Sequence, residues 1–189
     1  EDHLSRLDAG RSAIELACKR TQGLAASRIT SVLDAEAGSE RKLGTIARSV
    51  KNGIFVSRAS PEPNGVPILR IGAVRSMALS LDDLRYSGIN EDELLAGDAL
   101  LRPGDLLFTR YNGNPRFVGA SAVVDDRKIP LTYPDKLIRV RLDLDLASPE
   151  FVCMAANYGR TRREIEAKFK TSAGQVGISG RELKAISIA

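Results

Sequence analysis

The chain has 189 residues, of which 43% are hydrophobic and 28% are charged. This composition is typical of a folded globular protein, and no stretch approaches the roughly 20 consecutive apolar residues that a membrane span needs. A formal net charge of +4 and a pI near 9.2 are compatible with a polyanionic partner but do not require one. No secretory signal pattern opens the sequence, so the expected location is the cytoplasm.

Residue types that carry common enzyme chemistry are scarce. His3 is the only histidine, which excludes histidine-based triads and Cys–His nucleophile pairs. Cys18 and Cys153 are far apart and have no CxxC partners, so the sequence predicts no zinc site. Neither a glycine-rich cofactor loop nor the Asn/Asp-Pro-Pro-aromatic motif of DNA methyltransferases is present, and Pro134-Asp135 is not followed by a nuclease-type acidic-x-Lys triplet. We therefore expect a non-catalytic protein with no cofactor and no metal.

The first element is a predicted helix from Asp2 to about Glu36, a stretch without proline. Its apolar residues recur at steps of three, four or seven, which is a helical spacing. They are Leu4, Leu7, Ile14, Cys18, Ala25, Ile29 and Val32. Two interpretations remain about equally open: a helix folded back on its own domain, and an intersubunit coiled coil. We expect Gly38-Ser39 to end the helix, and the apolar stripe to be exposed unless a second copy covers it.

After Gly44 the sequence changes to short apolar runs separated by turn formers, which predicts strands. The expected strands are Gly53–Ser57, Val66–Ile71, Asp105–Tyr111, Val118–Val124 and Lys136–Leu142. Helices are expected over Pro149–Tyr158, Arg160–Lys170 and Gly180–Ala185, followed by a terminal strand. The fold class is thus α/β (α+β), with a spacer helix over residues 1–38 and one strand-rich domain over 39–189. The alternation in Leu137–Leu142 predicts a half-exposed strand with Arg139 and Arg141 on its solvent face.

Cations next to turns and aromatic residues form the candidate binding site. Arginine can hold phosphate or guanine with two parallel hydrogen bonds, and asparagine can pair with adenine. The candidate DNA-binding residues are Arg58, Arg75, Arg110, Tyr111, Asn112, Asn114, Arg116, Lys128 and Lys136. On spacing alone, however, the Arg110–Arg116 loop is more often structural, since Asn-Gly and Asn-Pro are ordinary turn formers.

Four ordered segments resemble a known family. Leu101–Gly113 is similar to the "pGDlLftR.ng" segment, and Val118–Val124 to the "vG.saiv" strand, of target-recognition domains in type I restriction-modification specificity subunits. Thr132–Val140 resembles the strand before that family's helical part. Lys170–Ser179, with the apolar residues after it, resembles its closing signature, and Glu1–Asp8 the start of its central conserved helix.

The resemblance implies a central conserved helix followed by a second target-recognition domain. It implies that the domain reads one half of a bipartite site in double-stranded DNA, while the helix docks methylation subunits and, through them, the restriction subunit. It also raises the binding interpretation of the Arg110–Arg116 loop above the structural one, whereas Gly104, Asp105 and Gly113 are expected to shape the turn. A homodimer through the helix is expected for this chain, and no membrane. The alternatives are a recognition domain of a fused restriction-methyltransferase and a scaffold that binds no nucleic acid.

Overall fold

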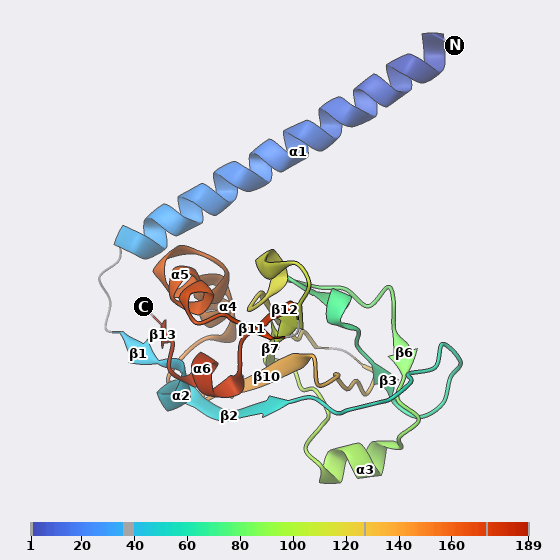
Figure 1. Ribbon diagram of the computed structural model, residues 1–189, viewed down its shortest axis with the longest axis vertical. Helices are drawn as coiled ribbons and strands as arrows, with labels where there is room; N and C mark the ends of the chain where they lie inside the picture. Colours follow the sequence, from blue (N-terminus) through green and yellow to red (C-terminus); the bar gives the residue numbers. More distant parts are fainter. Residues whose placement is uncertain (1, 36–39, 127, 173, 189) are drawn as a thin grey trace.

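The computed structural model describes residues 2–35, 40–126, 128–172 and 174–188. A long helix, α1 (Asp2–Ala35), leads to a body of mixed helices and strands, so the predicted fold class is confirmed. The C-terminal end of α1 packs on the body, whereas its N-terminal half projects away from it (Figure 1). The interpretation that this helix folds back on its own domain is therefore wrong for that half. No helix in the described part of the chain is long and apolar enough to cross a membrane.

The body is built around an antiparallel four-stranded sheet in the order β2-β10-β7-β9. Its strands are β2 (Ala47–Asn52), β10 (Leu137–Leu142), β7 (Leu106–Thr109) and β9 (Ser121–Val123). The register places Val140 of β10 opposite Val50 on one side and Leu106 on the other. Because β10 has a neighbour on both edges and is rich in branched residues, it forms the middle of the core.

Helices cover one face of this sheet and bury the larger apolar cluster. They are α2 (Leu43–Ile46), α4 (Pro149–Asn157), α5 (Gly159–Ala167) and α6 (Gly180–Lys184). Ile138 and Val140 point into this cluster and meet Val152 and Ile165, all of which are fully buried. The helices α4 and α5 lie between α1 and the sheet, so they connect the long helix to the core (Figure 1).

Short elements cover the other face of the sheet and its ends. They are β3 (Pro67–Ile68), η1 (Ile71–Ala73), β4 (Val74–Arg75), β5 (Ala78–Leu79), β6 (Arg85–Tyr86) and α3 (Glu91–Ala96). Elsewhere lie β1 (Arg41–Lys42), β8 (Tyr111–Asn112), η2 (Pro115–Phe117), β11 (Lys170–Ser172), β12 (Gln175–Gly177) and β13 (Ser187–Ile188). A second apolar cluster under the segment 69–84 contains Leu107 and Leu137 from the sheet.

The prediction that Arg139 and Arg141 lie on a solvent face of β10 is wrong. The alternation is present, but Arg139 is fully buried and Arg141 is 19% exposed. Arg139 donates to Asp98 Oδ2 at 2.7 Å, and Arg141 holds both carboxylate oxygens of Asp105 at 2.7 and 2.8 Å. The segment 98–105 covers this face and supplies the two carboxylates, so the arginines are buried as paired charges. Arg139 and, next, Lys51 hold the pKa of the Asp98 carboxyl well below its ordinary value.

Several of the expected strands are also displaced or shortened, among them Val118–Val124, which contains only β9. The expected strand at Gly53–Ser57 contains only a single bridge, Ile54 to Pro134, and the strand at this place is β2, which ends at Asn52. Gly53 lies against the backbone of Tyr133 and Pro134, where a Cβ atom would fall 2.2 Å from the Tyr133 carbonyl oxygen. Val66–Ile71 contains only the two-residue β3. The expected helix stop at Gly38-Ser39 lies outside the described residues.

Candidate nucleic-acid interface

The segment between β7 and β9 forms a loop that is held by its own asparagines. Asn112 Oδ1 accepts a hydrogen bond from the Asn114 backbone N–H at 2.9 Å, and Asn114 Oδ1 accepts one from the Arg116 N–H at 3.1 Å. The second bond caps η2, where Pro115 supplies a suitable first residue. Both amide oxygens are therefore engaged within the loop, which supports a structural role for the two asparagines and leaves their amide nitrogens as the groups to meet a ligand.

Arg110 and Tyr111 connect the start of this loop to the body. The Arg110 guanidinium lies 4.6 Å from the centroid of the Tyr111 ring, and its Nη1 donates to the carbonyl of Asp135 at 3.2 Å. The strand that contains Tyr111 pairs with β12, and a Cβ atom on Gly177 would fall 2.2 Å from the Tyr111 ring. Only glycine admits the ring there. Arg110 is half-buried, so it is less available to a large ligand than the loop's outer cations.

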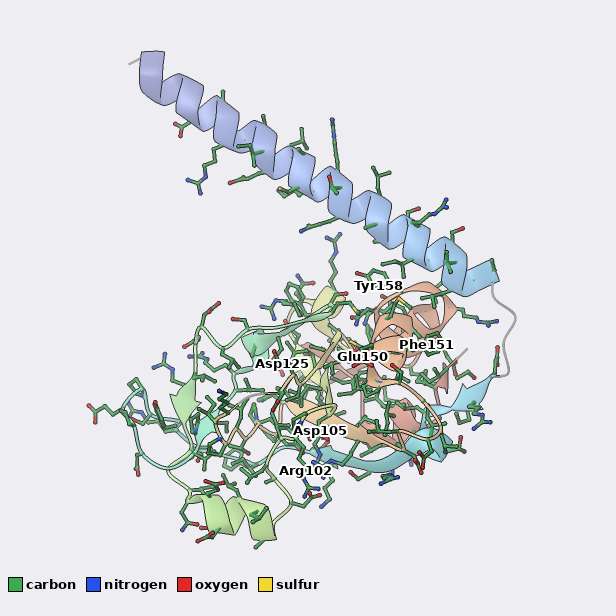
Figure 2. The ribbon with its side chains drawn as sticks, turned by 180° about the vertical axis from the view of Figure 1, so that it is seen from behind. Arg102, Asp105, Asp125, Glu150, Phe151 and Tyr158 are labelled. Carbon is green, nitrogen blue, oxygen red and sulfur yellow. The ribbon has the colours of Figure 1, made fainter. Side chains whose placement is uncertain are left out.

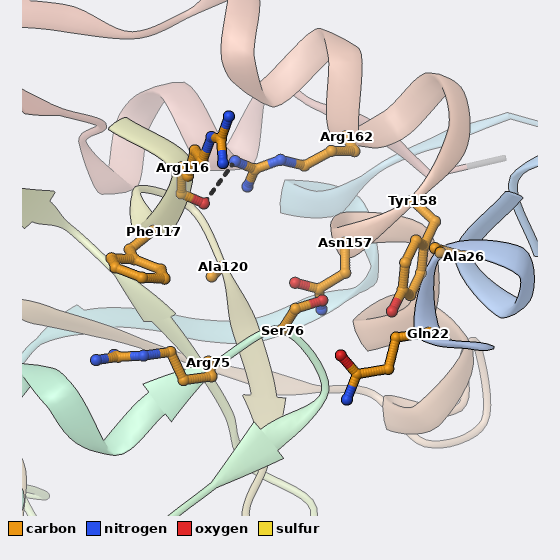
Figure 3. A pocket seen from close by; sticks show the side chains of 11 residues that line it. Gln22, Ala26, Arg75, Ser76, Arg116, Phe117, Ala120, Asn157, Tyr158 and Arg162 are labelled. Atoms are coloured by element: carbon orange, nitrogen blue, oxygen red, sulfur yellow. Dashed lines mark hydrogen bonds between the residues drawn. The ribbon is translucent and has the colours of Figure 1, made fainter. Parts of the chain in front are cut away.

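Arg75 and Arg116 line one pocket at the outer end of the loop. The Arg75 guanidinium lies 4.4 Å above the ring of Phe117, and both arginines are exposed. Figure 3 shows Arg75 below Phe117 and Arg116 above it, near Arg162, and both arginines line the same pocket. Stacking on the ring orients the Arg75 guanidinium, whose Nη1 donates to the Val74 carbonyl at 2.8 Å, so its other N–H groups are the ones that can meet phosphate or a base. The β4–β5 hairpin and the β8–η2 loop thus present two cations to one place.

Arg162 of α5 holds this loop from behind. Its Nη1 donates to the carbonyl of Val118 at 2.9 Å and its Nη2 to the carbonyl of Arg116 at 3.4 Å, the second bond being drawn in Figure 3. Gly119 has φ +68°, and a Cβ atom there would fall 2.5 Å from Cγ2 of Ile165. Glycine at this position therefore lets the loop lie directly against α5. The loop is anchored to a rigid helix and has a defined shape before any ligand binds.

The pocket in front of these arginines is a cavity of about 610 Å³ between the body and α1. Its lining comes from α1, the β4–β5 hairpin, η2 and the junction of α4 with α5. Gln22 of α1 and Tyr158 at the helix junction close the end of the cavity farthest from Phe117 (Figure 3). The side of the cavity formed by the body carries arginines, and the side formed by the long helix is neutral and polar. The cavity therefore suits an anionic group.

The remaining predicted site residues do not join this cavity. Lys136 is exposed on the rim of a second cavity of about 320 Å³, together with Arg70 and Arg85. Arg70 and Arg85 both contact Asp83, at 3.3 and 3.4 Å. Arg58 and Lys128 are exposed and line neither cavity. The predicted set is thus distributed over at least two places on the surface.

Sequence reasoning missed several residues at this surface. Arg162, Gln22 and Tyr158 lie on predicted helices, where nothing in the sequence indicates that they face the loop. By contrast, Thr171, Gly174 and Gln175 belong to the closing signature; they are exposed on the β11–β12 hairpin, which pairs with β8 in a separate three-stranded sheet. Gly174 has φ +75° and lies in the turn before β12, which begins at Gln175. No group of acidic, histidine or cysteine side chains that could hold a metal occurs among the described residues.

Two solved structures define the class of fold. The HsdS subunit from Thermoanaerobacter tengcongensis superposes with a TM-score of 0.58 at 17% identity, over 97% of this chain and 42% of that one. A chain from a structure on complex assembly and conformational transition of the type I R-M system superposes with a TM-score of 0.63 at 17% identity, over 98% and 43%. The helix with its strand-rich body therefore has the fold of part of these chains, less than half of the length of each. At this identity the likeness shows the fold alone.

The sequence comparison gives the family. The specificity subunit of the type I restriction enzyme EcoKI from Escherichia coli K12 is 39% identical over 143 residues, which cover 74% of this chain and 30% of that subunit. No protein-family model matches the chain. The chain is a homologue of type I restriction-enzyme specificity subunits, which confirms the resemblance carried by its four ordered motifs. The match spans less than a third of the length of this curated relative.

Proposed function

We propose that this chain is a DNA-recognition half of a type I specificity subunit, with a spacer helix over residues 1–38 and a target-recognition domain over 39–189. In this proposal the domain reads one half of a bipartite duplex site and performs no catalysis. One observation carries the proposal: Arg75 and Arg116, far apart in sequence, line one cavity, and Arg75 stacks on the Phe117 ring beside it. The homology to specificity subunits favours this function over a fused restriction-methyltransferase or a scaffold that binds no nucleic acid.

The positions of the candidate residues divide them into groups with different proposed contacts to DNA. The η2 tip and the β4–β5 hairpin are the outermost elements of the interface, so Arg116 and Arg75 are the side chains we assign to base edges or to the nearest phosphates. Arg110 and Tyr111 are half-buried and shape the loop from inside. Lys136, Lys128 and Arg58 lie apart from the cavity and are assigned to the phosphate backbone, where long-range charge matters more than exact fit.

The long helix is the proposed docking element. Of its predicted apolar stripe, Ile14 is 67% exposed and Val32 is 51% exposed, and Ile29 is half-buried. The side chains of Leu4 and Leu7 lie outside the described ones. An exposed apolar stripe on a helix fits burial against other helices. We propose that methylation subunits dock there and bring the restriction subunit with them, and that two copies of this isolated chain pair through the same helix.

The test is a titration of duplex DNA followed by fluorescence anisotropy at several salt concentrations. Binding by the unmodified chain is expected to weaken steeply with salt, because phosphate contacts release counterions. Arg116→Ala and Arg75→Ala are each expected to weaken binding by about 1–3 kcal/mol if they reach bases, or to reduce the salt slope by about 1 if they reach phosphates. Arg181→Ala, which removes an exposed arginine on α6, is the matched control.

Two results would contradict the proposal in different ways. A folded chain that shows no salt-sensitive DNA binding would favour the scaffold interpretation. Wild-type affinity and sequence preference in both Arg116→Ala and Arg75→Ala would move the interface away from this cavity, toward the surface around Lys136.

A further inference from the structure

The junction between α1 and the body lies near the C-terminal end of the helix, where α1 contacts α5. Among residues 8–35, whose side chains are described, Leu33 is the one that is buried, at 6% exposure. It lies one turn or less from the end of α1 and packs on Gly159, where a Cβ atom would fall 3.2 Å from the Cβ of Leu33 and 3.0 Å from Asp34 Oδ1. Gly159 has φ +64°, so the left-handed backbone and the missing side chain both favour glycine here. The last turn of α1 is seated directly on the start of α5.

Asp34 provides the N-terminal cap that α5 lacks. The cap position of α5 is Tyr158, and its side chain makes no capping hydrogen bond. Instead, Asp34 Oδ1 accepts the backbone N–H of Arg160 at 2.8 Å. A capping oxygen satisfies one of the free N–H groups in the first turn of a helix, and a carboxylate there is also favoured by the helix dipole. The role that a local Ser or Asp usually fills is filled from another helix, 126 residues away.

Two ion pairs surround this cap. Arg163, one turn further along α5, contacts both carboxylate oxygens of Asp34 at 3.0 and 3.1 Å. Arg160 Nη1 lies 3.6 Å from Glu40, which follows the connection between α1 and the body. The first turn of α5 thus holds the chain on both sides of that connection. Because α1 is 34 residues long, a small rotation at this junction moves its far end by many ångströms.

We infer that Asp34 is a positioning residue that fixes the direction in which α1 leaves the body. A consequence depends on the proposed function: if α1 spaces two recognition domains, this carboxylate determines which separation of half-sites the subunit accepts. The direction itself does not depend on DNA binding, so it can be tested separately.

The experiment measures the distance distribution between two spin labels by pulsed electron paramagnetic resonance. Cys18 is exposed on α1 and serves as one site, Asp92→Cys on α3 provides the other, and Cys153 is buried. Labelled chain is diluted into unlabelled chain, so that contacts between copies do not contribute. Asp34→Ala is expected to broaden the distribution, since loss of a cap changes a docking equilibrium about fivefold. Asp34→Asn keeps an acceptor for the cap and is expected to broaden it less.

Controls distinguish the cap from a general effect of charge. Glu15→Ala removes another carboxylate of α1, one paired only with Arg11 four residues away, and is expected to leave the distribution unchanged. An Asp34→Ala distribution as narrow as that of the unmodified chain would overturn the inference. The distribution of Asp34→Ala could broaden although neither this variant nor the unmodified chain binds DNA. That result would support the positioning role of Asp34 and contradict both the proposed function and the link to half-site spacing. If the affinity of Asp34→Ala for duplex DNA stays within about twofold of that of the unmodified chain, the substitution leaves the proposed DNA-binding surface unchanged.

Discussion

The long helix and the body are stabilised by different interactions. Most described side chains of α1 are exposed and project into solvent (Figure 2), and Leu33 alone among residues 8–35 is buried. In the body, strands that are distant in sequence pair across β10, and side chains such as Phe108, Val140 and Ile165 are fully excluded from water. The body can therefore be stable alone, whereas the helix depends on local hydrogen bonds, one short junction and a partner.

Charges show the same contrast. In α1, Arg11 and Glu15 form an exposed ion pair of the kind that contributes little to stability. In the body, Asp98 and Asp105 neutralise arginines inside the sheet, at the side away from α1 where Figure 2 labels Arg102 and Asp105. Buried charges are costly when they lose a partner. We therefore expect substitutions in the body to lower the free energy of unfolding much more than substitutions in α1.

The largest effect is expected from breaking the charge cluster at Asp98. Asp98→Asn keeps the shape of the side chain, and asparagine tolerates the left-handed backbone at this residue, where φ is 49°. It removes the carboxylate from Arg139, which stays fully buried, and from Arg141 and Lys51. We expect the free energy of unfolding to fall by about 3 kcal/mol, at the low end for buried pairs because the carboxylate is partly exposed.

Urea unfolding followed by circular dichroism measures this change. Asp126→Asn removes a carboxylate from an exposed position and is the matched control, expected to shift the free energy by less than about 0.5 kcal/mol. Equal effects of the two substitutions would show that the cluster does not stabilise the body as its geometry suggests.

A smaller effect is expected from acid, through the helix cap at Glu182. Burial alone would raise the pKa of Glu182, but Lys170 and the N–H of Ser179 outweigh it and lower the pKa to about 2. A group whose pKa is lowered on folding stabilises the folded state above its unfolded pKa, and this contribution is lost as the pH falls. We expect the free energy of unfolding to decrease between about pH 5 and pH 2, and Glu182→Gln to flatten part of that decrease. Glu62→Gln, on an exposed loop, is the control; the same flattening in both variants would assign the slope elsewhere.

The sequence predicted α1, α4, α5, α6 and the middle of the body well, but it did not predict the short helices α2 and α3. Ser148 and Pro149 indicate the start of α4, and the apolar run at Leu106–Thr109 is a buried strand, as expected. The segment 53–100 was predicted poorly, because its strands are two residues long and are held by distant contacts such as Ile68 with Thr132. The burial of Arg139 could not be predicted either, since its carboxylate partner at Asp98 comes from a segment 41 residues earlier.

For the interface, the sequence indicated the residue types but not their grouping. Arg116 lies next to Phe117 in the sequence, and no periodicity links this pair to Arg75, which reaches the same ring from another hairpin. The junction residue Asp34 carried even less signal, because a carboxylate near the end of a helix is common and its capping target lies in α5. Contacts between elements, rather than patterns within one, decide which candidate residues meet.

The smallest effect on folding, and a large one on association, is expected from a charge in the exposed stripe of α1. Ile14→Asp replaces an exposed apolar side chain, so the free energy of unfolding of the body should change by less than about 0.5 kcal/mol. If two copies pair through α1, the buried carboxylate would weaken that pairing, because an unpaired charge in an apolar seam is unfavourable. Sedimentation equilibrium over a range of concentrations measures the association, and Ser12→Asp, at an exposed position outside the stripe, is the control. A monodisperse monomer of the unmodified chain at high concentration would contradict pairing through α1, while loss of body stability in Ile14→Asp would show that the helix and the body are not independent.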